Sequence, residues 1–159
     1  MKKYYLIGLI IAILIIIILL FIKFRKRPVE ISSIKYFHFS YDKGYMMNAN
    51  IIYEVNYNDN KYLVKIKPYM VSDEDALEKE ISSDEVKKIE DILVKYNVNK
   101  WDGFQRVDKN VLDGNSFSLS VGFMDENSIH ASGYMMYPKG YGDVRGALDE
   151  FFMNIYDNR

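Results

Sequence analysis

Residues 116–123 read Ser-Phe-Ser-Leu-Ser-Val-Gly-Phe, and this stretch decides the fold class. Large apolar residues stand at positions 117, 119, 121 and 123, and small residues stand between them. Alternation with a period of two indicates a β-strand that has one apolar face and one thin polar face. Because only one face is apolar, we expect a sheet that is covered on a single side.

The β-strand signal recurs on both sides of this stretch, in segments rich in β-branched and aromatic residues. The predicted strands are residues 34–41, 49–57, 61–69, 117–123 and 129–137. Asn58-Asp59-Asn60 and Asp125-Glu126-Asn127 make connections of hairpin length between them. Connections this short join antiparallel neighbours, so the sequence predicts an antiparallel sheet.

Two further segments predict helices. Ser82-x-x-Glu85 is a capping box, and apolar residues follow it at helical spacing as far as Tyr96. Residues 141–156 form a second amphipathic segment, and residues 101–113 form a long connection without a clear period. The predicted fold of this part is α+β, one antiparallel-sheet domain of order βββ-α-ββ-α with its helices on one face.

The N-terminal segment has a different character. From Leu6 to Ile22 the chain carries no charge, and Ile, Leu and Phe dominate the run. As a helix, residues 4–22 reach roughly 28 Å, close to the ~30 Å hydrocarbon core of a bilayer. The bulky, basic residues 23–27 lack the small-residue pattern at which signal peptides are cleaved. The sequence therefore predicts an uncleaved transmembrane helix that acts as a signal anchor.

These signals divide the chain into two predicted parts. Residues 1–27 are a transmembrane anchor with basic flanks, and residues 28–159 are a single extramembrane α+β domain. The slight charge contrast across the apolar segment favours the domain inside the cell. A short tail before a first apolar segment usually stays in the cytoplasm, and on this ground we expect the domain outside the cell membrane, at the bacterial cell envelope. The predicted protein is a single-pass membrane protein.

Charge and cysteine content exclude several classes of partner. Six of the 21 Lys and Arg residues precede residue 28, so residues 28–159 hold 15 basic and 22 acidic residues, a net charge of −7. Nucleic-acid binding requires a basic surface, so this sequence argues against it. The chain contains no cysteine, which excludes disulfides and a lipid-bearing cysteine.

Residues that carry catalysis or metal binding are sparse. His38 and His130 fall within predicted strands and lack the spacing of metal ligands. No serine lies in a nucleophile elbow, and no glycine-rich phosphate loop occurs. Residues 108–114 gather several oxygens but depart from the calcium-loop pattern. We expect no enzyme, no catalytic, metal or cofactor-binding residue, and no cofactor.

The aromatic content is the remaining signal. Fourteen Tyr and nine Phe are more than the predicted core requires. Tyr134, Met135, Met136, Tyr137 and Tyr141 concentrate Tyr and Met just before the last helix. Both residue types are enriched at recognition surfaces because they offer a large contact area at a small entropy cost. These five residues are the predicted partner-binding site.

Three motifs in order carry a resemblance to a known family. They are Lys-Trp-Asp-Gly-Phe at 100–104, Val-Leu-Asp-Gly-x-Ser-Phe-Ser-Leu at 111–119, and Ile-His-Ala-Ser-Gly-Tyr at 129–134 with Tyr137-Pro138 after it. This set resembles a family of small uncharacterised Gram-positive bacterial proteins that are membrane-anchored or lipoprotein-like. The resemblance covers roughly residues 80–156 and implies an extracytoplasmic domain without a known activity. The chain departs from the lipoprotein members because it has no cysteine.

Three functions fit the sequence. The first is a binding module at the envelope, whose partner is a protein, a peptide or a wall component. The second is a cell-surface hydrolase that uses carboxylates, for example Asp102, Asp108 and Asp113, if two of them converge in one cleft. The third is a structural subunit whose helix docks with other membrane helices, and the anchor argues against it because Gly8 and Ala12 are its single pair of small residues at helical spacing.

Overall fold

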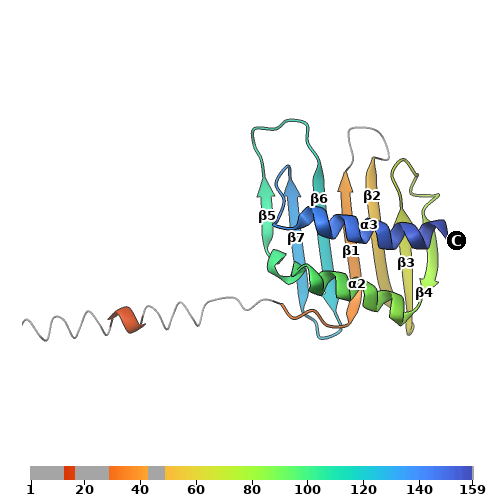
Figure 1. Cartoon of the computed structure of the whole chain (residues 1–159), viewed down its shortest axis with the longest axis horizontal. Coiled ribbons are helices and arrows are strands. Elements are labelled where there is room, and N and C mark those ends of the chain that lie inside the picture. Colours follow the sequence, from red (N-terminus) through yellow and green to blue (C-terminus); the bar gives the residue numbers. More distant parts are fainter. Residues whose placement is uncertain (1–12, 17–28, 43–48, 159) are drawn as a thin grey trace, which may run out of the picture.

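The computed structural model describes residues 13–16, 29–42 and 49–158 (Figure 1). Within them lie seven strands: β1 (Ile34–Asp42), β2 (Asn50–Asn58), β3 (Lys61–Lys67), β4 (Leu77–Ile81), β5 (Phe104–Val107), β6 (Ser116–Phe123) and β7 (Ser128–Tyr134). The helices that accompany the strands are α2 (Ser83–Lys95), the short 3₁₀ helix η1 (Val98–Trp101) and α3 (Tyr141–Asp157).

The strands form one mixed sheet in the order β4-β3-β2-β1-β6-β7-β5. All neighbours are antiparallel except β5 and β7, which run parallel. The predicted fold, an antiparallel sheet of order βββ-α-ββ-α, is therefore wrong in strand number, strand order and strand direction. The described chain follows the order ββββ-α-βββ-α, with η1 after the first helix.

The two strands that the sequence did not predict, β4 and β5, depend on the neighbouring strands. In β4 the sequence is Leu-Glu-Lys-Glu-Ile, and its acidic residues pair with lysines on β3. Lys61 Nζ lies 2.7 Å from Glu80 Oε2, and Lys65 Nζ lies 3.4 Å from Glu78 Oε1. β5 has four residues, of which three are exposed, and it is held by its pairing with β7. Neither strand has the length or alternation that predicts a strand from sequence alone.

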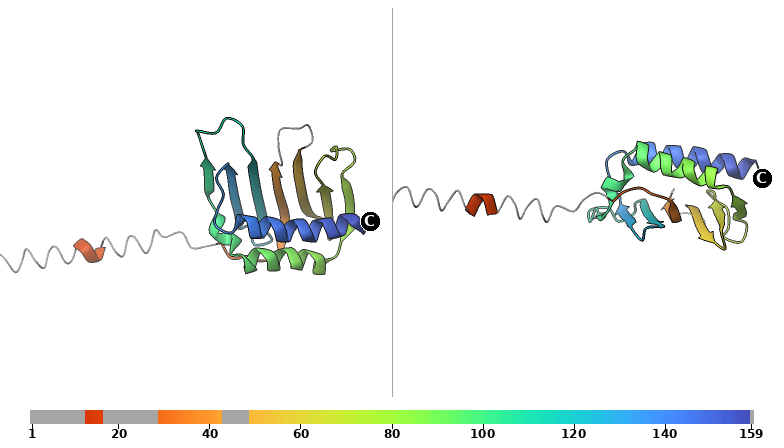
Figure 2. Two further views of the ribbon diagram at one scale, coloured as in Figure 1. Left: turned by 45° about the horizontal axis from the view of Figure 1, so that its top comes forward. Right: turned by 90° about the horizontal axis from the view of Figure 1, so that it is seen from below.

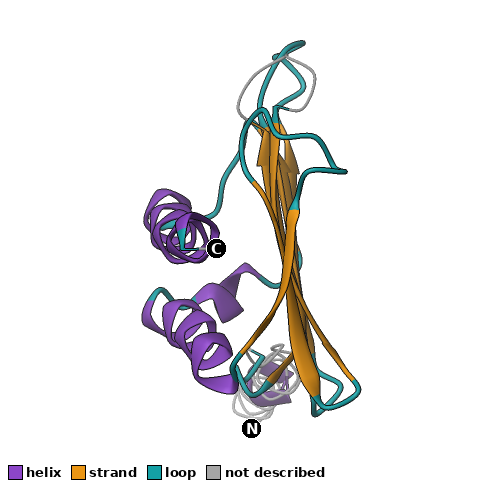
Figure 3. Cartoon of the chain, turned by 90° about the vertical axis from the view of Figure 1, so that its right-hand side faces the viewer, coloured by secondary structure: helices purple, strands orange, loops and turns teal. Residues whose placement is uncertain are grey.

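The helices α2 and α3 lie on the same side of the sheet. Seen along the sheet edge, both are on one side of the strands, and the other face carries no helix among the described residues (Figure 3). Two further views show the same two-layer arrangement (Figure 2). The core lies between these layers and takes alternate residues of the strands, such as Phe37, Phe39 and Leu119.

The start of α2 follows its sequence signal. The Ser82 hydroxyl accepts a hydrogen bond from the Glu85 backbone N–H, and the Glu85 carboxylate accepts one from the Ser82 N–H at 2.8 Å. The predicted capping box is confirmed. One helical turn before its end, α2 also contacts the sheet, because Glu90 Oε1 accepts a hydrogen bond from Ile34 N at 3.0 Å. This bond fixes the helix against the start of β1.

The predicted transmembrane helix is corrected. Of the segment Leu6–Ile22, the structure describes residues 13–16 alone, as about one turn of exposed helix, and the rest lies outside the described residues. No helix in the described part of the chain is long and apolar enough to cross a membrane. A span requires about 20 consecutive residues, so this finding contradicts the predicted transmembrane helix and signal anchor, which rested on hydropathy, segment length and the flanking residues.

Candidate functional site

The predicted binding residues lie where β7 leads into α3. Tyr134 is the last residue of β7, and the side chains that follow it remain exposed: Met135 by 38%, Met136 by 38% and Tyr137 by 39%. Tyr141 is the first residue of α3 and is buried. Its ring stacks on that of Tyr137, with centroids 4.5 Å apart. The structure thus brings four of the five residues to the surface and places Tyr141 against the core.

The connection between β5 and β6 adds apolar side chains beside them. Val107 is opposite Tyr134 in the sheet and is 61% exposed, and Leu112 is 94% exposed. The Tyr134 hydroxyl donates a hydrogen bond to the Leu112 carbonyl oxygen at 2.8 Å, which ties the two segments together. We call this surface the apolar corner, and it consists of Val107, Leu112, Tyr134, Met135, Met136 and Tyr137.

Backbone hydrogen bonds hold the apolar corner in shape. Met135 N–H donates to the Asn115 carbonyl at 3.0 Å, and Asp108 N–H donates to the Tyr134 carbonyl at 3.0 Å. The Tyr137 hydroxyl donates to the same Asn115 carbonyl at 3.3 Å. A surface held in this way loses little conformational freedom when it binds a partner.

Gly133 allows the chain to turn back at this corner. A Cβ atom at this position would lie 2.0 Å from the Met136 carbonyl oxygen and 2.7 Å from the Phe117 ring. Backbone cannot be displaced as easily as a flexible side chain, so the turn requires glycine here. The geometry of the apolar corner therefore depends on a residue that is not itself exposed.

A second candidate site lies along α3. Tyr141, Arg145, Asp149 and Met153 are spaced four residues apart and so share one side of the helix. Asp149 and Met153 line a pocket of about 340 Å³ between this side of α3 and the sheet. It is lined by Tyr41, Ile51, Tyr53, Pro68, Tyr69, Asp149 and Met153. We call it the tyrosine pocket.

Two phenols converge on one carboxylate in the tyrosine pocket. The Tyr41 hydroxyl lies 2.7 and 2.8 Å from the two Asp149 oxygens, and the Tyr53 hydroxyl donates to Oδ1 at 2.9 Å. Burial raises the pKa of Tyr41 and of Tyr53 well above the ordinary phenol value, and the neighbouring Asp149 carboxylate raises both further. Both hydroxyls therefore stay protonated and act as donors to Asp149.

The negative charge of Asp149 has no ion-pair partner among the described residues. Arg145 is the cation that lies four residues before Asp149 on the same side of α3. Its guanidinium carbon lies 5.5 Å from the centre of the Tyr41 ring and 5.9 Å from that of Tyr141. Arg145 thus packs over aromatic rings beside the tyrosine pocket and does not line it.

Polar residues cover the open face of the sheet, which faces away from the helices. His38 Nδ1 lies 3.0 Å from Glu54 Oε1, and His38 Nε2 lies 3.0 Å from Ser40 Oγ. The order Glu–His–Ser is that of a hydrolase triad, but acyl transfer also requires free N–H donors for an oxyanion. β1 pairs with β2 on one side and β6 on the other, so its backbone N–H groups serve the sheet. We therefore interpret the hydrogen bonds among Glu54, His38 and Ser40 as contacts that stabilise the polar face of the sheet.

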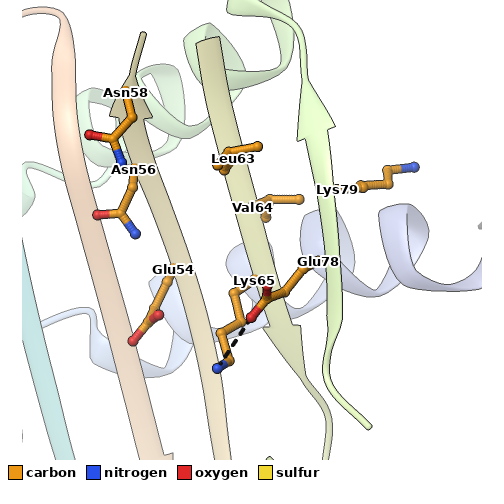
Figure 4. A pocket seen from close by; sticks show the side chains of 8 residues that line it. All are labelled: Glu54, Asn56, Asn58, Leu63, Val64, Lys65, Glu78 and Lys79. Atoms are coloured by element: carbon orange, nitrogen blue, oxygen red, sulfur yellow. Dashed lines mark ion pairs between the residues drawn. The ribbon is translucent and has the colours of Figure 1, made fainter. Parts of the chain in front are cut away.

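A depression on the open face lies over β2, β3 and β4 (Figure 4). Its charged residues include Glu54, Lys65 and Glu78, and the figure marks the ion pair between Lys65 and Glu78. Because Glu54 contacts His38, the acidic groups here already have partners. Lys79 adds a further cation, so the depression mixes charges of both signs and selects no class of ligand.

Two of the three carboxylates predicted for hydrolysis accept hydrogen bonds from the backbone. Asp102 Oδ1 accepts a hydrogen bond from the His130 backbone N–H at 3.2 Å, and Asp108 Oδ1 accepts one from the Asn110 N–H at 2.9 Å. Asp113 is exposed in the connection before β6. In the described part of the chain, no group of three or more His, Asp or Glu side chains is arranged to hold a metal ion.

Sequence reasoning missed the tyrosine pocket. Tyr41 and Tyr53 lie in two of the predicted strands, and a phenol that becomes buried there requires a partner for its hydroxyl. This requirement is the sequence signal that could have located the pocket, because it predicts a hydrogen-bond acceptor on the helix that packs over these strands. Asp149, next to the core residue Leu148, is that acceptor.

Comparison with known proteins adds no relative to this picture. No protein-family model matches the chain, and a search of curated proteins found no match. The resemblance to the Gram-positive family therefore stays a prediction, and the candidate sites rest on the geometry of this chain.

Proposed function

We propose that this protein is a binding module whose contact surface is the apolar corner. The observation that carries the proposal is the exposure of Met135, Met136 and Tyr137, each by more than a third, on a backbone that is fixed by hydrogen bonds. Folding normally buries side chains of this kind where it can. Large apolar side chains gathered at one place on a surface are typical of protein interaction sites.

The composition of the apolar corner favours a protein or peptide partner. Tyr and Met are enriched in the centre of protein interfaces, whereas Lys, Glu and Asp are depleted there. The six residues of the apolar corner include no charged side chain. A partner that presents an apolar segment of its own fits this surface best. The proposal does not depend on a membrane segment.

Site-specific photo-crosslinking tests the proposal in the native cell. The full-length chain would carry a benzophenone amino acid at Met136 in one variant and at Val94 in the control. Val94 is 54% exposed on α2, which lies away from the apolar corner, so it reports nonspecific contacts. We expect one discrete adduct from position 136 and none of the same mass from position 94.

The partner identified in this way would then be purified and titrated against the wild-type chain and the variant Leu112→Ser/Met136→Ser. If each of the two truncations costs about 1 kcal/mol, as is usual for interface residues that matter to binding, affinity should fall roughly 30-fold. No adduct at position 136, or equal affinity for wild type and variant, would overturn the proposal.

A further inference from the structure

The tyrosine pocket combines aromatic surface with a carboxylate. Tyr41, Tyr53 and Tyr69 contribute rings, while Pro68 and Met153 complete an apolar wall. Asp149 is the one acidic residue that lines the pocket. With a volume of about 340 Å³, the pocket lies at the small end of the range for ligand sites, about 300–1,000 Å³. It can hold a side chain or a small molecule.

Among the described residues, the hydrogen bonds of Asp149 come from uncharged donors, and neither Arg145 nor another cation makes an ion pair with it. A carboxylate has about four acceptor positions, and the hydroxyls of Tyr41 and Tyr53 supply two protons to it. Both donors are neutral, so they satisfy part of the hydrogen-bonding capacity and none of the charge. An unpaired carboxylate that is partly removed from water gains free energy when a cation reaches it.

The lining selects the class of cation. Aromatic rings attract ammonium groups through their negative faces, and this attraction adds to that of a carboxylate. An apolar wall favours a ligand that carries its charge on a hydrocarbon stem. Anions are disfavoured by Asp149, and a neutral ligand would leave the carboxylate charge unmatched. A hydrated metal ion would make no use of the aromatic and Met surfaces.

We infer that the tyrosine pocket binds an alkylammonium group, with the ammonium against Asp149 and the stem between the tyrosine rings and Met153. The group belongs either to a lysine side chain of another polypeptide or to a free small amine. This inference is independent of the apolar corner, because the two sites share no residue.

A two-dimensional amide NMR titration of the full-length chain tests the inference. The probes are n-butylammonium chloride and two molecules of the same length, n-butanol and sodium butyrate. A ligand of only five heavy atoms that fits its site well reaches a dissociation constant on the order of a millimolar. We expect saturable shifts at the amides of Asp149 and Met153 with the ammonium. Equal shifts with n-butanol, or none with the ammonium, would overturn the inference.

Charge removal at Asp149 gives the sharpest variant. Asp149→Asn keeps an oxygen that accepts from the tyrosines but removes the charge, and binding should weaken at least about tenfold. Glu150→Gln is the matched control, since it removes the same charge from the adjacent, exposed position of α3. Unchanged binding by Asp149→Asn, or an equal loss in both variants, contradicts the inference.

A second variant covers the case in which Asp149→Asn does not fold. Tyr69 is 38% exposed at the rim of the pocket, so its removal should leave the fold intact. Tyr69→Ala should weaken n-butylammonium binding several-fold, as loss of one cation–π contact of about 0.5–1 kcal/mol predicts. Tyr69→Phe keeps the ring and should bind as wild type does. Wild-type affinity in Tyr69→Ala would contradict the aromatic part of the site.

Two further probes distinguish the source of the ammonium. Nα-acetyl-lysine amide presents a lysine side chain as it occurs in a polypeptide, and its ε-acetylated form is the neutral control. Binding at least as tight as that of n-butylammonium assigns the pocket to a lysine of a partner chain. Binding of n-butylammonium alone assigns it to a free amine. Binding of the ε-acetylated form as tightly as the charged form would overturn the ammonium assignment.

Discussion

The aromatic stack beneath α3 and the apolar corner contain similar side chains in opposite situations. Tyr53 stacks on Phe152 with ring centroids 4.5 Å apart, and the Phe37 ring stacks on Phe152 at 5.8 Å. These three side chains are at most 1% exposed, whereas Met136 and Tyr137 are 38% and 39% exposed. Aromatic and sulfur-containing residues therefore have two uses in this domain. One set fastens the helix to the sheet, and the other remains accessible.

This comparison makes a general prediction. If the apolar corner serves a partner, its side chains should matter little to the free energy of unfolding and much to binding. For the stack beneath α3, the opposite should hold. Substitutions in the two regions test that difference.

Phe152→Ala should have the largest effect on stability. Phe152 is fully buried and contacts rings on both β1 and β2, so its loss leaves a cavity between α3 and the sheet. We expect the free energy of unfolding to fall by about 3–5 kcal/mol. Urea denaturation followed by circular dichroism measures this change. A loss below 1 kcal/mol would show that the stack does not fasten the helix.

Gly133→Ala should have an intermediate effect, because it strains the backbone next to the apolar corner. The new methyl group would meet the Met136 carbonyl, so the turn must shift. Overpacking of this kind costs about 1–3 kcal/mol. The same denaturation measurement gives the loss, and partner binding should weaken with it. Gly146→Ala is the control, because a Cβ there meets nothing within 4 Å.

Tyr53→Phe should have a smaller effect that depends on pH. The pKa of Tyr53 is raised in the folded state, first by burial and then by Asp149. Stability from the protonated phenol is fully present below the unfolded pKa, near 10, and is lost as the pH rises above it. At pH 8 the variant should lose about 1 kcal/mol through the missing hydrogen bond. The difference between wild type and variant should shrink between pH 8 and pH 11, and a constant difference would contradict the raised pKa.

Leu112→Ser/Met136→Ser should have the smallest effect on stability. Leu112 is 94% exposed and Met136 is 38% exposed, so little buried surface is lost. We expect the free energy of unfolding to change by about 0.5 kcal/mol or less. A loss above 2 kcal/mol would place these side chains among those that hold the fold. The apolar corner would then need no partner to explain it.

Sequence patterns located the strands that carry their own alternation. β1, β2, β3, β6 and β7 lie where the period of two predicted them, although the predicted end of β7 extended three residues too far. The three extra residues, 135–137, are Met-Met-Tyr, and their apolar and aromatic side chains favoured the prediction of a longer strand. In the structure Met135 has a φ of 55°, which ends the strand.

Features that depend on tertiary neighbours were beyond such patterns. β4 is a strand because it pairs along its whole length with β3, and β5 is a strand because it pairs with β7. The tyrosine pocket depends in the same way on Asp149, which lies about 100 residues from Tyr41 and Tyr53 in sequence. The exposure of the apolar corner is also a tertiary property, since composition alone does not say which Tyr and Met residues are covered.

The most direct test of the binding proposal measures stability and affinity in the same variant. The partner captured at position 136 would be titrated by calorimetry against wild type and Leu112→Ser/Met136→Ser, and both proteins would be denatured under the same conditions. Our account predicts a roughly 30-fold loss of affinity with almost unchanged stability. Unchanged affinity in a variant that is equally stable would contradict it.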